Sequence, residues 1–84
     1  MELREQVEKI QTRDDFVTFM YHLVRDLRTY PEHWDNTSLD AYLTALAAWV
    51  QDMDGYYYNR GEESPQHLMW KHVGEILLAA RIYE

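Results

Sequence analysis

The sequence predicts an all-α fold, a compact helical bundle of three main helices plus a short N-terminal helix. Apolar residues recur at helical spacing in four segments, helix-capping residues precede several of them, and no segment reads convincingly as a strand. The chain has 84 residues, 46% of them hydrophobic and 27% charged, which is typical of a folded domain. We therefore expect a single helical domain over residues 1–84.

The N-terminal part predicts the short helix and the first main helix. Leu3, Val7 and Ile10 share one face of the short helix. Thr12 then fits a helix cap, with Asp15 as the acidic partner of a capping box. This helix must end near residue 30, because a proline at position 31 disfavours helical backbone just before it. Its apolar stripe consists of Phe16, Phe19, Met20, Leu23 and Leu27.

A turn over residues 32–36 precedes the second main helix, which is expected to start at Thr37 or Ser38. Gly55 is expected to stop it, leaving residues 56–63 as a loop. Its predicted core stripe is Leu39, Leu43, Leu46, Val50 and Met53. Beside this stripe lies a face of small residues that another helix could approach closely, namely Ala41, Ala45 and Ala48.

The pair Ser64-Pro65 predicts the start of the last helix, because proline is favoured at the first helical position. Trp70 and Leu77 widen the inner face of this helix. The face itself is expected to consist of Met69, Val73, Ile76, Ala80 and Tyr83.

Charge is distributed unevenly along the chain. Residues 31–64 hold seven acids and one base, a balance of −6, whereas the whole chain has a formal net charge of −7. Half of the aromatic residues lie in the same segment. Phosphate binding draws on clustered Lys and Arg, so this distribution argues against nucleic acid as a partner. The scarcity of basic residues argues equally against anionic membranes.

The composition also restricts chemistry and location. The chain has no cysteine, which excludes disulfides, thiolate metal sites and cysteine nucleophiles. Its longest nearly uncharged apolar stretch, residues 41–50, is shorter than the roughly 20 residues that a membrane helix needs. The N-terminus has no apolar signal-peptide core. We expect a cytoplasmic protein without membrane association.

Three short elements are distinctive: Trp34-Asp35-Asn36, the DGYY string at residues 54–57, and Ile82-Tyr83-Glu84. Together with the strings LDAYLTALAAW and ILLAARIYE, they resemble a family of small uncharacterised bacterial proteins, a domain of unknown function. The resemblance runs from about Asp15 to Glu84. It implies a helical fold and no assigned activity, so it gives no residue a catalytic role.

A candidate binding surface combines acids and aromatic rings near the predicted end of the second main helix. Asp52 and Asp54 would oppose the helix dipole there, and such local inconsistencies are enriched at functional positions. The alternative is that both aspartates are solvated and partly offset by Arg60. Three consecutive tyrosines cannot all be buried from one loop, so at least one ring is available for contact. The candidate surface consists of Trp34, Asp52, Asp54, Tyr56, Tyr57, Tyr58, Arg60, Glu62 and Glu63.

Metal and catalytic motifs are missing from the sequence. An EF-hand that places Asp52 and Asp54 at ligand positions 3 and 5 puts Val50 at position 1 and Gly61 at position 12, where ligands are required. His67 and His72 are five residues apart and would face different sides of a helix. There is no HExxH, GxSxG or phosphate-binding glycine loop. We therefore predict no metal site, no cofactor and no enzymatic activity.

The leading functional hypothesis is a non-enzymatic protein-interaction module with an acidic-aromatic surface. Its partner would be a protein with a basic surface, because complementary charge steers encounter. The alternative is a small-molecule or divalent-cation binding domain that uses the clustered carboxylates and tyrosines. A third possibility is self-association, with the aromatic segment completing a homodimer interface.

Overall fold

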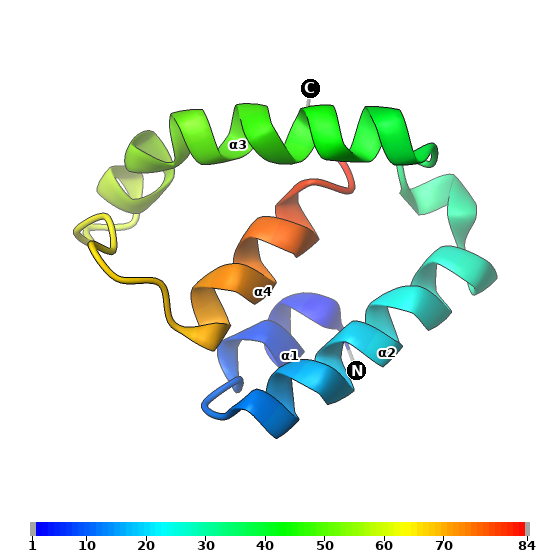
Figure 1. Ribbon diagram of the computed structural model, residues 1–84, viewed down its shortest axis with the longest axis horizontal. Helices are drawn as coiled ribbons and strands as arrows, with labels where there is room; N and C mark the ends of the chain where they lie inside the picture. Colours follow the sequence, from blue (N-terminus) through cyan, green and yellow to red (C-terminus); the bar gives the residue numbers. More distant parts are fainter. Residues whose placement is uncertain (1, 84) are drawn as a thin grey trace.

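The computed structural model describes residues 2–83 and is all-α (Figure 1). The helices are α1 (Leu3–Glu8), α2 (Arg13–Thr29), α3 (Leu39–Asn59) and α4 (Trp70–Ala79), and a 3-10 turn, η1 (Pro31–His33), joins α2 to α3. No strand occurs within residues 2–83. The predicted fold class, three main helices plus a short N-terminal one, is confirmed.

Helix α4 is the centre of the bundle. It packs against α1, α2 and α3, and in Figure 1 it lies between α3 on one side and α1 and α2 on the other. No Cα atom of α2 (residues 13–29) lies within 8 Å of a Cα atom of α3 (residues 39–59). The bundle is therefore open between α2 and α3.

The predicted starts of two helices and the end of one are confirmed. Thr12 accepts a hydrogen bond from the backbone N–H of Asp15 at 3.1 Å, and the Asp15 carboxylate accepts from the N–H of Thr12 at 3.3 Å. The Ser38 hydroxyl accepts from the N–H of Ala41 at 3.1 Å, which identifies Ser38 as the cap of α3. Helix α2 ends at Thr29, just before Tyr30 and Pro31.

The predicted end of α3 is wrong. The helix continues through Gly55 to Asn59, so residues 56–59 are helical and not part of a loop. The N–H of Glu62 bonds to the carbonyl of Tyr57 at 2.8 Å, and the N–H of Gly61 bonds to the carbonyl of Tyr58 at 3.0 Å. This pair of bonds is a Schellman motif, which needs a residue of positive φ, and Gly61 has a φ of 73°.

The predicted start of α4 is also wrong, because the helix begins at Trp70 and not at Ser64-Pro65. The Ser64 hydroxyl donates to the Asp54 carboxylate and therefore caps no helix. At the true start, His72 Nδ1 accepts a hydrogen bond from the N–H of Met69 at 3.0 Å. This contact satisfies one of the unpaired donors of the first helical turn.

The core face of α3 differs from the predicted stripe. Leu39 is 73% exposed, Leu43 is 53% exposed, and Val50 is also exposed. The buried face is centred on Ala45 and Trp49, because α4 approaches α3 along the small-residue face. Leu46 and Met53 of the predicted stripe pack against the core, whereas its other three residues stay in contact with solvent.

Two groups of buried side chains form the core. One joins α1, α2 and α4 around Val7, Ile10, Phe19 and Leu23. Gly74 of α4 lies against this group so closely that a Cβ atom there would stand 2.8 Å from Ile10 Cδ1 and 2.9 Å from Val7 Cγ2. The second group joins α3 to α4 and consists of Trp49, Tyr57 and Ile76.

The turn before α3 is fastened to the end of α4. The backbone N–H groups of Asp35 and Asn36 bond to the carbonyl of Arg81, at 2.9 and 3.0 Å. The Asn36 amide donates to the carbonyls of Ala80 at 3.0 Å and Tyr83 at 2.9 Å. Two of the distinctive sequence elements, at residues 34–36 and 82–83, are therefore neighbours in space. Glu84 of the second element lies outside the described residues.

Candidate functional site

The three consecutive tyrosines of the candidate surface occupy the last turn of α3 and lie in different environments. Tyr57 is buried in the core, at 2% exposure, whereas Tyr58 is 82% exposed. Tyr56 is half-buried and packs against Trp49, with ring centroids 5.2 Å apart. The prediction that not all three rings are buried is confirmed, and only Tyr58 presents a largely free ring.

A buried carboxylate organises the inner two tyrosines. Glu75 of α4 is 6% exposed, and its Oε1 accepts a hydrogen bond from the Tyr57 hydroxyl at 3.1 Å. Its Oε2 lies 3.4 Å from Arg60 Nη1 and accepts from the Tyr56 hydroxyl at 3.5 Å. Burial raises the pKa of the Tyr57 hydroxyl, and the adjacent Glu75 raises it further. The charge of Glu75 is thus paired, as a buried carboxylate requires.

An outer layer of ion pairs surrounds this centre. Arg60 Nη2 lies 3.4 Å from Glu8 and 3.8 Å from Glu62, and Lys71 Nζ lies 3.0 Å from Glu8. The hydrogen bond from Lys71 is the main cause that lowers the pKa of Glu8. The network connects α1, the end of α3 and α4. Tyr56, Tyr57 and Arg60, predicted as surface contacts, therefore act within the fold.

Glu75, Glu8 and Lys71 were not predicted as members of any site. One indication was available for Glu75: it is the only charged residue in the string VGEILLAA at positions 73–80. A lone acid in such a run is expected to be buried with partners, because an unpaired buried charge is strongly unfavourable. Nothing in the sequence identifies those partners, which lie on other helices.

Trp34 is not a surface anchor, contrary to its place in the candidate surface. It is 8% exposed, and its Nε1 donates to Asp26 Oδ2 at 2.8 Å. The Tyr42 ring lies beside it at 5.9 Å, and the Arg81 guanidinium carbon lies 5.7 Å from its ring centroid. Trp34 belongs to the core because η1 turns the chain back over the ends of α2 and α4.

Asp52 and Asp54 lie inside α3, more than one turn before its end at Asn59. The helix dipole therefore does not act against their charges, because its effect falls off within the last turn. Asp52 accepts a hydrogen bond from the Tyr83 hydroxyl, which raises the pKa of Tyr83. Asp54 accepts from Ser64. Both aspartates are exposed and fasten neighbouring segments to α3.

The remaining acidic surface is at the end of α3. Tyr58, Glu62 and Glu63 are exposed there, together with the two aspartates. Within residues 2–83, no group of three or more His, Cys, Asp or Glu side chains is arranged to hold a metal ion. In the same range, no helix is long and apolar enough to cross a membrane.

An apolar groove lies between α2 and α3 and was not predicted. It has a volume of about 330 Å³. Val24 and Leu27 of α2 form one wall, Leu39 and Tyr42 of α3 form the other, and Trp34 and Leu77 line it between them. Burial raises the pKa of Tyr42 to about 12, and its hydroxyl donates to the Leu77 carbonyl at 2.6 Å.

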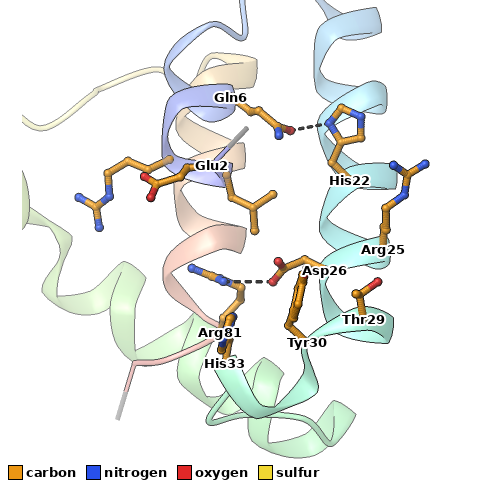
Figure 2. Close-up of a pocket in the computed structure, with 11 residues that line it drawn as sticks. Glu2, Gln6, His22, Arg25, Asp26, Thr29, Tyr30, His33 and Arg81 are labelled. Carbon is orange, nitrogen blue, oxygen red and sulfur yellow. Dashed lines mark hydrogen bonds and ion pairs between the residues drawn. The ribbon is translucent and has the colours of Figure 1, made fainter.

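A second, polar hollow of about 730 Å³ lies on the other flank of α2, beside α1 and Arg81 (Figure 2). An ion pair of 3.4 Å between Asp26 and Arg81 crosses it. Further up in Figure 2, His22 Nδ1 and Gln6 Oε1 form a 2.5 Å hydrogen bond between α2 and α1. Leu3 is the only aliphatic side chain among the residues that line this hollow.

Comparison with known proteins gives a family and no activity. No curated protein and no solved structure matches the chain. A family model described as a family of unknown function, DUF7660, matches residues 12–84. This range covers α2, η1, α3 and α4 with their connections. The chain belongs to this family of unknown function.

Proposed function

We propose that this protein is a non-enzymatic interaction module that binds a basic, amphipathic helix of a protein partner in the groove between α2 and α3. The observation that carries the proposal is the apolar groove itself, whose walls hold exposed Val24 and Leu39 side chains. Grooves lined in this way receive the apolar face of a partner helix in many complexes.

The exposed apolar residues supply the driving force. Leu39 is 73% exposed and Leu43, one turn further along α3, is 53% exposed. Fully burying a leucine side chain yields about 1.5–3 kcal/mol, so covering the exposed parts of these two yields roughly 2–4 kcal/mol. Val24 of the opposite wall is 39% exposed and adds to this sum. Such a patch is typical of an interaction site.

Charge favours a basic partner. Glu32, Asp35 and Asp40 are exposed in the segments that flank the groove residues 36–39. The acidic surface at the far end of α3 extends the same sign of charge, and the chain carries −7 in total. Complementary charge raises association rates, so this part of the predicted acidic-aromatic surface would steer a basic partner.

The test compares matched substitutions of exposed leucines. Leu39→Lys places a cation in the groove, whereas Leu68→Lys changes a leucine outside the groove that is also exposed, at 55%. Proteins captured from a lysate are quantified by mass spectrometry, and helical peptides from the specifically captured proteins are titrated by fluorescence anisotropy. We expect Leu39→Lys to weaken peptide binding at least tenfold and Leu68→Lys to leave it within about twofold, a difference of at least about 1 kcal/mol.

Two results would contradict the proposal. Equal capture and peptide affinity for both variants would show that the groove takes no part in binding. Light scattering that gives a dimer for the wild type and a monomer for Leu39→Lys would assign the groove to self-association. The alternative function, divalent-cation binding, is supported only by the exposed carboxylates of residues 52, 54, 62 and 63. A melting temperature shifted by millimolar Ca²⁺ or Mn²⁺ would support it.

A further inference from the structure

We propose that the polar hollow between α1, α2 and Arg81 is a binding site for a small anion that carries a carboxylate or phosphate group. The chain has eight Lys and Arg residues in 84, and three of them, Arg4, Arg25 and Arg81, line this one hollow. The acids in its lining are Glu2 and Asp26. With neutral histidines the lining carries +1, in a protein whose net charge is −7.

The internal contacts leave two of the three guanidinium groups available. Asp26 Oδ2 lies 3.4 Å from Arg81 Nη1 and accepts from Trp34 Nε1 at 2.8 Å, so the charges of Asp26 and Arg81 largely compensate each other. Arg4 and Arg25 are exposed and have no ion-pair or hydrogen-bond partner within residues 2–83. They stand on different helices, α1 and α2, and line the same hollow.

Arginine is suited to this ligand chemistry. Its planar guanidinium donates two parallel hydrogen bonds to a carboxylate or phosphate, and these charge-assisted bonds are stronger than neutral ones. Figure 2 shows the Arg25 side chain extending outward from α2, away from α1, so its guanidinium would have to turn toward an anion held in the hollow. The volume of about 730 Å³ is within the range of small-molecule sites, roughly 300–1,000 Å³.

The remaining lining adds polar and flat surfaces. Figure 2 shows Thr29 at the end of the helix that carries Arg25, Tyr30 just after it, and His33 next to Arg81. The Tyr30 and His33 rings stack with centroids 5.2 Å apart and an angle of 11° between their planes. His22 meets Gln6 across the hollow and so fixes α1 against α2. The hydroxyl groups of Thr29 and Tyr30 offer donors that would supplement the arginines.

The site is distinct from the α2–α3 groove. The hollow is lined by residues 22, 25, 26 and 29 of α2, and the groove by residues 20, 23, 24 and 27. These two sets lie on different sides of a helix. Substitutions at the exposed arginines therefore test the anion site without altering the groove.

The experiment titrates the full chain with sodium phosphate and, separately, with sodium succinate by isothermal titration calorimetry at low ionic strength. Arg25→Gln is compared with Arg28→Gln, an exposed arginine on the same helix that does not line the hollow. We expect saturable binding at millimolar concentration or tighter for one or both anions. Arg25→Gln should weaken it about tenfold, the change that one charge-assisted hydrogen bond produces, and Arg28→Gln by less than about twofold.

The outcomes separate the two ligand chemistries. Binding of phosphate alone indicates a phosphorylated ligand, and binding of succinate alone indicates a carboxylate; both support the site. Amide chemical shifts in the ¹⁵N–¹H spectrum should move at His22, Arg25 and Tyr30 and stay constant at Leu39 and Leu43. Lack of saturation with either anion, or equal weakening by the two variants, overturns the proposal.

Discussion

Replacing Gly74 by alanine tests the contact between α4 and α1 on which the bundle is built. A Cβ atom at position 74 would lie 2.8 Å from Ile10 Cδ1, 2.9 Å from Val7 Cγ2 and 3.6 Å from Phe19 Cε2. The isoleucine methyl can rotate away, but Val7 is β-branched and stiff, so α1 itself must shift. Overpacking of this kind costs about 1–3 kcal/mol. Alanine also favours the helix by about 1 kcal/mol over glycine, which leaves a net loss of about 1 kcal/mol.

The matched control is the same substitution in α3. Gly55 is in the helix interior, and a Cβ atom there would meet nothing within 4 Å. Gly55→Ala should therefore stabilise the protein by about 0.5–1 kcal/mol through helix propensity alone. Urea unfolding followed by far-ultraviolet circular dichroism measures both values, provided that the m-value is unchanged.

If Gly74→Ala stabilises the protein as much as Gly55→Ala does, α1 does not pack against α4 at Gly74 and the predicted loss is refuted. The double variant Val7→Ala with Gly74→Ala gives a further check. Removing the valine methyl groups opens the space that the new Cβ needs. The loss of unfolding free energy caused by Gly74→Ala should therefore be smaller in the Val7→Ala background. The difference, which is the coupling energy of the two positions, should be about 1 kcal/mol.

Two further predictions concern the polar contacts of the fold. Asn36→Ala removes hydrogen bonds to the carbonyls of Ala80 and Tyr83, and should destabilise the protein by about 1–3 kcal/mol in thermal unfolding. An unchanged melting temperature would show that these two hydrogen bonds do not stabilise the fold. Burial raises the pKa of Tyr42 to about 12. The unfolded chain therefore loses this proton first, and stability falls as the pH rises above about 10, by about 1.4 kcal/mol at pH 11. Tyr42→Phe should make the alkaline decrease shallower by that amount, and an identical pH profile would argue against the burial of this hydroxyl.

The sequence predicted those features of the fold that are decided by neighbouring residues. The Thr12–Asp15 capping box, the Ser38 cap and the stop before Pro31 each involve residues at most three positions apart. Such contacts form as soon as the local segment is helical, so their residue types are informative. The fold class followed from the same local patterns.

The end of α3 and its buried face depend on distant residues and could not be predicted in this way. Gly55 was predicted as the stop, and the helix continues past it because Tyr57 finds Glu75, 18 positions later, as a buried partner. The choice between the Leu39 stripe and the Ala45 face depends on where α4 approaches. Amphipathicity alone gives an apolar arc, not the part of it that another helix covers.

The candidate site was predicted in part for the same reason. Tyr58, Glu62 and Glu63 are exposed as a surface role requires, whereas Trp34 is buried by contacts with Asp26 and Arg81. Neither hollow was predicted. A groove arises where two helices fail to meet, and a cluster of arginines arises where three chain segments converge. Both are properties of tertiary structure.

The distinctive sequence elements have tasks inside the molecule, and this separates structural from functional residues in this chain. Asn36 and Tyr83 fasten the turn before α3 to the chain end that follows α4, and Tyr57 holds the buried Glu75. These residues account for the recognisable pattern without any ligand. By contrast, the Leu39 side chain is mostly open to water, and the Arg25 guanidinium has no hydrogen-bond or ion-pair partner within residues 2–83. The exposed Leu39 side chain lowers solubility, and the Arg25 side chain makes no contact that stabilises the fold. Residues without an internal task are therefore the ones at which substitutions should alter binding without altering stability.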